Sequence, residues 1–327
     1  MMLQADDALD WAHVATQLVG FLGSYALYGA VGARVAAPRI AEWRGASSER
    51  VASWGATGGR RVALIGIAGC VGQVASIVLA AAERAAEHHA PLSTAFTGPG
   101  SNLVSQLALV ALALIGFLLA RFRLRAGWWL AGAAALAIAL RNFATSGKWA
   151  ALVNPLHVLA GGLWLGTLAV LVVVLFPLLL RGDAVGRDPD VRPGGSRLDA
   201  VVRRFSKLAL VSSALLGVTG VITAWRHLGA LDALWTTSYG WALIVKLLIV
   251  AVIVGFGFYN WRFATPGLSA GSGDARLARA SVREVSLGLV VLMVTAVLVS
   301  LPAPAEREKG PTQSHGAAGP GQPPAAH

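Results

Sequence analysis

The sequence is poor in cysteine, in methionine and in charge. It has one cysteine, Cys70, and three methionines in 327 residues. A single cysteine excludes an intramolecular disulfide and any zinc or iron–sulfur site built from several thiolates. Charged residues make up 13% of the chain, whereas roughly 25% is usual in soluble domains. The composition therefore argues against an ordinary soluble domain.

What the chain does contain is a series of long apolar runs. Hydrophobic residues make up 56% of it, and its mean hydropathy is +0.64. A helix needs roughly 20 apolar residues to cross the hydrocarbon core of a bilayer. About eight runs reach or approach that length, near 11–33, 62–82, 103–120, 128–144, 152–180, 205–227, 239–261 and 283–301. The predicted fold is an all-α polytopic membrane bundle of about eight transmembrane helices.

The basic residues predict how this bundle is oriented. Most of the 27 Lys and Arg residues fall in the connections from the first span to the second, the third to the fourth, the fifth to the sixth and the seventh to the eighth. Short cytoplasmic loops carry such an excess of positive charge. Both termini are therefore predicted to be periplasmic. The net charge of +11 then reflects loops beside anionic lipid, so we expect membrane lipid and no nucleic acid as a partner.

Three regions are expected along the chain. Residues 1–150 form an N-terminal membrane block of about four helices, and residues 151–304 form a second membrane domain of about four. The tail 305–327 is rich in Pro, Gly and Ala. Such a composition cannot bury a core, so this tail is predicted to be disordered in the periplasm.

Three histidines are predicted to lie at one height in the bundle. His13 falls in the first turn of the first span, His157 follows the Asn-Pro start of the fifth span, and His227 closes the sixth. With both termini outside, all three belong to the outer face. Imidazole is the commonest metal ligand, so they are candidate ligands of one metal ion. Interfacial hydrogen bonding to lipid headgroups and water is the alternative.

Other polar residues within the spans are also candidates, because ionisable groups in lipid are costly. Trp164 shares a helical stripe with His157. Lys246 and Asn260 share a face of the seventh span, and Glu284 opens the eighth at the level of Asn260. These residues form either a polar pathway through the bundle or isolated hydrogen bonds between helices.

The second outer loop offers another metal-binding candidate. His88 and His89 follow Glu83 and Glu87, and this group could capture a metal ion before it enters the bundle. An ordinary solvated loop explains the same residues.

The second half of the chain, about residues 150–304, resembles the copper-resistance protein D (CopD) family. The resemblance rests on separate short motifs whose spacing matches the family. They are the L-H-x-L-x-x-x-x-W-x-G stretch (Leu156 to Gly166), R-R-F-S (Arg203 to Ser206), T-G (Thr219, Gly220), Y-G (Tyr239, Gly240), K-L-L (Lys246 to Leu248), the Asn260 and Glu284 positions, and S-L-P (Ser300 to Pro302).

This resemblance implies a multi-pass protein of the bacterial inner membrane that handles copper, in resistance or uptake. His157, Trp164, Lys246, Asn260 and Glu284 occupy the family's motif positions. The implied ligand is a copper ion and the implied partner is a periplasmic copper carrier. Such a protein transports rather than catalyses, so no enzymatic activity is expected.

Two other functions fit the sequence. Two of the histidines could be axial ligands of haem b in a membrane electron-transfer protein with redox activity. The inner half of the bundle, however, holds no histidine for the second haem that electron transfer across the bilayer normally uses. A membrane assembly factor without a cofactor is the third possibility.

Overall fold

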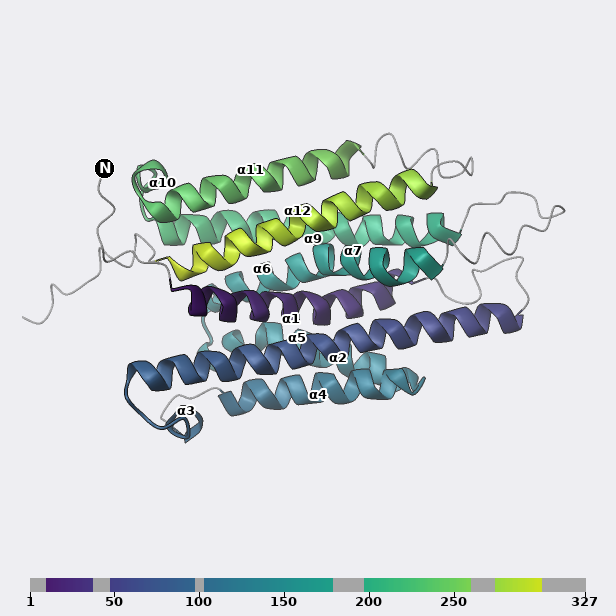
Figure 1. Cartoon of the computed structure of the whole chain (residues 1–327), viewed down its shortest axis with the longest axis horizontal. Coiled ribbons are helices and arrows are strands. Elements are labelled where there is room, and N and C mark those ends of the chain that lie inside the picture. The colour runs from purple at the N-terminus through teal and green to yellow at the C-terminus, as the bar shows by residue number, and fades with distance from the viewer. Residues whose placement is uncertain (1–9, 38–47, 98–102, 179–196, 260–273, 302–327) are drawn as a thin grey trace, which may run out of the picture.

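A computed structural model shows the chain as a bundle of long helices (Figure 1). The structure describes residues 10–37, 48–97, 103–178, 197–259 and 274–301. All regular secondary structure in these ranges is helical. The result confirms the predicted all-α fold, which follows from the bilayer: only a helix satisfies every backbone hydrogen bond within one segment.

The helices follow the predicted apolar runs closely. Seven of them are α1 (Trp11–Ala36), α2 (Ser48–Glu87), α4 (Leu103–Arg121), α5 (Arg125–Ser146), α9 (Arg197–Leu228), α11 (Ser238–Tyr259) and α12 (Asp274–Ser300). Two short helices, α3 (Thr94–Thr97) and α10 (Ala233–Thr236), lie in connections. The Asp10 carboxylate caps α1 by accepting from the backbone N–H groups of Ala12 and His13, which are otherwise without helical partners.

The fifth predicted span is a composite helix. It consists of η3 (Trp149–Leu152), α6 (Val153–Gly161), η4 (Gly162–Gly166), α7 (Thr167–Val170) and η5 (Leu171–Leu175). The first piece is a 3₁₀ turn, and both η4 and η5 are π-helical. A π turn holds more residues than an α turn, so it shifts the face on which every later side chain lies.

Within the described ranges, seven helices are long and apolar enough to cross a membrane. The exception among the eight predicted spans is 128–144. It does form a helix, α5, but that helix falls short of the hydropathy of the other seven. The difference has a chemical cause, since two Trp, two Gly and the Arg141–Asn142 pair dilute its apolar residues.

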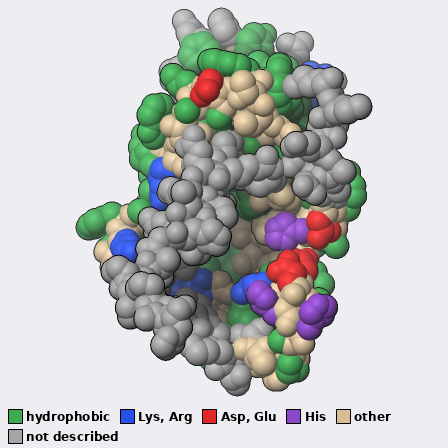
Figure 2. All heavy atoms as spheres, turned by 90° about the vertical axis from the view of Figure 1, so that its left-hand side faces the viewer, with side chains coloured by type: hydrophobic (Ala, Val, Ile, Leu, Met, Phe, Trp, Pro, Cys, Tyr) green, Lys and Arg blue, Asp and Glu red, His purple; other side chains and the backbone are tan. Residues whose placement is uncertain are grey.

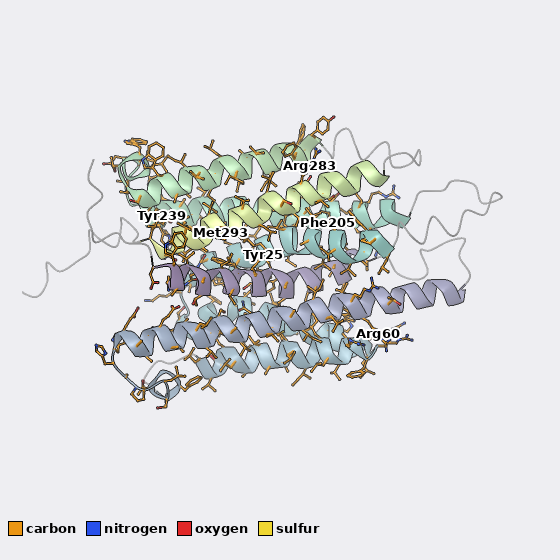
Figure 3. The ribbon with its side chains drawn as sticks, in the orientation of Figure 1. Tyr25, Arg60, Phe205, Tyr239, Arg283 and Met293 are labelled. Atoms are coloured by element: carbon orange, nitrogen blue, oxygen red, sulfur yellow. The ribbon has the colours of Figure 1, made fainter. Side chains whose placement is uncertain are left out.

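Successive long helices run in opposite directions through the bundle (Figure 1). The start of α1 and the end of α12 consequently lie at one end, which we call the histidine end because His13, His157 and His227 belong to helix segments near it. Arg60 and Arg283 lie toward the opposite end, and Tyr239 lies at the histidine end (Figure 3). Which end faces the periplasm stays a prediction.

Glycines set the close approach of α1 to its neighbours, because a residue without a side chain lets helix backbones come together. A methyl group on Gly69 of α2 would lie 2.6 Å from the backbone nitrogen of Leu27, and one on Gly23 would lie 2.8 Å from the nitrogen of Gln73. A methyl group on Gly29 would collide with the backbone of Gly166. These helices therefore touch backbone to backbone.

Helix α1 packs against both predicted membrane blocks. It contacts α2 and α5 from the first block, and α6, η4, α7, α9 and α12 from the second. The largest core cluster likewise combines Leu27 and Phe117 with Val170 and Val174. The boundary near residue 150 stays a prediction, but the two sides of it share one core.

Candidate functional site

His157 has the best-defined surroundings of the three predicted metal ligands. It lies in α6, and its Nδ1 is 3.1 Å from Oγ1 of Thr219 in α9. Beside Thr219, a methyl group on Gly220 would lie 3.1 Å from Cε1 of His157. Gly220 therefore leaves room for the imidazole, and Thr219 holds it.

These contacts determine which ring nitrogen of neutral His157 carries the proton. The Thr219 hydroxyl lies 2.7 Å from the carbonyl oxygen of Leu215, to which it donates. A hydroxyl has one proton to donate, so toward His157 it accepts. The Nδ1–H of His157 is therefore the donor, and Nε2 keeps the lone pair that a metal ion would use.

Lys246 of α11 lies within electrostatic range of the His157 ring. Its side chain is half-buried. Residues of α6 and α9 thus meet around His157, with Lys246 of α11 within electrostatic range. Three positions of the predicted family motifs are involved: His157, the Thr219–Gly220 pair and Lys246. We call this group the His157 cluster.

His13 has a different environment, between α1 and α2. Its Nδ1 lies 3.0 Å from Oε2 of Glu83, and the other carboxylate oxygen, Oε1, accepts from the hydroxyl of Thr16. Its Nε2 lies 3.2 Å from the amide nitrogen of Gln17. Both ring nitrogens are therefore engaged, and His13 links α1 to α2.

His227 lies at the end of α9. Its Nδ1 donates to the carbonyl oxygen of Thr223 at 2.8 Å, so Nε2 carries the lone pair of the neutral ring. The imidazole stacks on Tyr239 of α11, with ring centroids 6.1 Å apart and an interplanar angle of 11°. Thr223, which accepts from His227, lies one turn of α9 beyond Thr219, which contacts His157.

The structure does not assemble the three histidines into one group. In the part of the chain that it describes, no cluster of three or more His, Cys, Asp or Glu side chains could hold a metal ion. A shared metal site for His13, His157 and His227 stays a prediction.

Two further details concern the composite helix around His157. A methyl group on Gly161, one turn beyond His157, would collide with the hydroxyl of Tyr25 in α1, so this hydroxyl fills the space that the glycine leaves. Trp164 is half-buried within the π-helical η4. The stripe that joins His157 to Trp164 assumes uninterrupted α-helical turns, and the π turn breaks that register.

The predicted polar pathway is described only in part. Asn260 lies outside the described residues. Glu284 is 9% exposed in α12, so its carboxylate is buried as expected for an internal role. His88 and His89 are exposed where α2 ends, and His89 has a positive φ of 50°.

The sequence reasoning missed a cavity of about 510 Å3. Its lining comes from α1, α2, α4, α5, α6 and α9 and includes Gln73, Gln106, Arg141, Arg226 and His227. Figure 2 looks onto the histidine end of the bundle, where His and acidic side chains gather at one edge and the surface is hollowed beside basic side chains. Gln73 in α2, Gln106 in α4 and Arg141 in α5 are polar residues within apolar helices, and this feature of the sequence could have predicted the cavity.

The fold and these polar groups define a class of protein. The chain is a multi-pass helical membrane protein in which polar side chains from several helices meet inside the bundle, toward one end.

The comparison with known families narrows this class. The model of the family described as CopD, copper resistance protein D, matches residues 199–298. The resemblance is therefore confirmed over α9 to α12, the part that contains Thr219, Gly220, Lys246 and Glu284. His157 precedes the matched segment.

One curated relative is the copper transport protein CutJ of Bacillus subtilis (strain 168). The two sequences are 28% identical over 155 residues, which cover 47% of this chain and 26% of the relative. The matched part thus spans about a quarter of that relative's length. No solved structure matches the chain.

Proposed function

We propose that this chain handles copper in the bacterial inner membrane, in uptake or resistance, and receives the ion through Nε2 of His157. One observation carries the proposal: Thr219 fixes the imidazole by its Nδ1–H, and Nε2 is left with a lone pair. A second residue that orients a histidine in this way is a regular feature of metal sites. The similarity to the copper resistance protein D family supports copper as the metal.

One imidazole does not complete the coordination of a copper ion. A periplasmic copper carrier would supply the remaining ligands during transfer, with His157 as the first residue of the membrane protein to bind. His227 is a candidate for a later step, because its Nε2 also carries a lone pair and it lies about two turns beyond Thr219 on α9. In this role the protein transports copper and catalyses no reaction.

Lys246 bears on how long copper stays at His157. A positive charge within electrostatic range repels a copper cation, and the repulsion is stronger in the low dielectric of a bundle than in water. We propose that Lys246 weakens copper binding, which favours passage over storage.

Copper binding to His157 can be tested on the purified protein. We expect His157→Ala to lose bound copper, measured as metal per protein after competition with a chelator of known affinity. The matched control is Lys148→Ala, because Lys148 is exposed directly before the composite helix that carries His157 and belongs to no candidate site. Equal copper binding by both variants and the parent protein would contradict the proposal.

The same variants test the function in cells. Copper accumulation should change when the gene is deleted, and His157→Ala should reproduce the deletion while Lys148→Ala does not. The absorption spectrum of the purified protein tests the haem alternative, because stoichiometric haem b gives an intense Soret band. If the parent protein showed such a band and His157→Ala abolished it, the result would support electron transfer and contradict copper handling.

A further inference from the structure

The cavity at the histidine end is a second candidate site. His157 is not among its lining residues, although His227 is. It lies between helices of both membrane blocks, and Gln73, Gln106, Arg141, Asn154 and Arg226 give it polar walls. No Asp or Glu occurs among the described residues that line it. Two guanidinium groups therefore face one cavity with no carboxylate in its lining.

The two arginines come from helices that are far apart in sequence. Arg141 belongs to α5, six residues before the C-cap Gly147, and Arg226 belongs to the last turn of α9. Arg226 donates to the carbonyl oxygen of Ala150 at 3.0 Å. The fold, rather than local sequence, brings the two positive charges to one place.

Gln106 of α4 holds the guanidinium of Arg141. When its amide is oriented with the oxygen toward Arg141, that oxygen accepts from both terminal nitrogens, at 2.6 and 2.8 Å. Gln106 is neutral, so it positions the guanidinium without cancelling its charge. An arginine held in this way is suited to bind a planar or tetrahedral oxyanion.

Apart from Ser24, Tyr28 and His227, the remaining lining is apolar. It includes Ile77, Val110, Ile138 and Val158. A cavity with positive charge on one part and aliphatic side chains on another fits a ligand with an anionic group and an apolar body. A free anion would use the charged part alone.

We propose that this cavity binds a phosphate oxyanion through Arg141 and Arg226. The oxyanion belongs either to the headgroup of an anionic phospholipid or to free phosphate. Placing two arginines at the end predicted to be periplasmic runs against the usual distribution of positive charge, and an anionic ligand compensates this cost. The proposal does not depend on copper binding.

The test measures thermal unfolding of the full-length protein in an uncharged detergent. One arm adds sodium phosphate against sodium chloride of equal ionic strength. The other adds dihexanoyl phosphatidylglycerol against uncharged dihexanoylglycerol. A ligand that binds only the folded state raises the unfolding temperature in a concentration-dependent way, and this dependence gives its apparent affinity.

We expect the phosphatidylglycerol, the phosphate or both to stabilise the parent protein. Arg141→Gln and Arg226→Gln should weaken the apparent affinity by about tenfold or more, since each removes a charge-assisted hydrogen bond. Arg84→Gln is the matched control: Arg84 is exposed near the same end in α2 and does not line the cavity. Its affinity should equal that of the parent protein.

The outcomes separate the two ligand sources. A response to phosphatidylglycerol alone assigns the site to a lipid headgroup, and an equal response to phosphate assigns it to the free anion. No response to either, or the same loss in Arg84→Gln as in Arg141→Gln, would overturn the proposal. If Arg141→Gln does not fold, Arg226→Gln and the charge-preserving Arg141→Lys still decide it. Copper binding measured on the same variants should be unchanged, which distinguishes this proposal from the copper function.

Discussion

At the scale of single residues, the three histidines differ in which nitrogen each has available. His13 uses both ring nitrogens to link α1 and α2. His157 and His227 each donate through Nδ1 and keep a lone pair on Nε2. The hydrogen-bond partners, and not the shared height of the residues, therefore distinguish a candidate metal ligand from a structural histidine.

Thr219 provides a test of how His157 is positioned. We expect Thr219→Val to weaken copper binding by about 10- to 100-fold, the range usual for loss of a residue that orients a metal ligand. Thr219→Ser keeps the hydroxyl and should bind like the parent protein. A chelator competition titration measures both, and an unaltered affinity in Thr219→Val would show that the Nδ1 hydrogen bond plays no part.

Substitution of Lys246 should change copper affinity in the opposite direction. Replacing it in Lys246→Gln removes a positive charge near His157, so we expect copper affinity to rise by about tenfold, or about 1.4 kcal/mol of relieved repulsion. Lys246→Arg keeps the charge and serves as the control. If copper binds equally to both variants in the titration, Lys246 does not act on the ion by its charge.

At the scale of helices, backbone contact through glycine positions the site. Gly29 of α1 lies against Gly166 of η4, immediately after the helix that carries His157. Gly32, one turn further along α1, lies against Thr167, whose hydroxyl is buried without a hydrogen-bond partner in the described structure. The composite helix is thus held against α1 along more than one turn.

Gly29→Ala should therefore destabilise the bundle. The methyl group would meet the backbone of Gly166, which cannot rotate away as a side chain can, and overpacking of this kind costs typically about 1–3 kcal/mol. Gly217 of α9 has nothing within 4 Å of the corresponding position, so Gly217→Ala should be neutral or slightly stabilising, because alanine favours a helix over glycine. Thermal unfolding in detergent compares them, and equal unfolding temperatures would mean that α1 and η4 can separate at little cost.

At the scale of the whole molecule, Arg60 and Arg283 lie toward the end of the bundle opposite Tyr239 (Figure 3). His227 stacks on Tyr239 at the histidine end. The distribution of positive charge predicts that the histidine end is periplasmic. This orientation decides whether His157 can receive copper from the periplasm.

The orientation can be measured by cysteine labelling. Cys70 is the single cysteine and is buried, so Cys70→Ala provides a cysteine-free background. We expect a membrane-impermeant maleimide to label His88→Cys in intact spheroplasts, and Arg123→Cys only after permeabilisation. The reverse pattern would place the histidine end in the cytoplasm and contradict uptake of copper from the periplasm through His157.

Part of this site was within reach of sequence reasoning. His157, Thr219, Gly220 and Lys246 were singled out from the family motifs, and the structure brings them together. The face of Trp164 could not be predicted, because the π turn in η4 changes the helical register without any clear sign in the sequence. The cavity was missed because Arg141 and Arg226 are 85 positions apart and meet only through the packing of α5 and α9.

The amino-acid sequence alone determined the class of fold and the positions of the apolar helical segments, because a bilayer demands continuous apolar segments and satisfied backbone groups, and both are properties of a local stretch of chain. It did not determine where α2, α9 and α12 begin, which is 14, 8 and 9 residues before the predicted runs. The tertiary structure decided which polar side chains meet. Hydrogen-bond partners and cavities depend on how helices rotate and approach one another, and here that is set by backbone contacts at glycines such as Gly29 and Gly166 and by π turns.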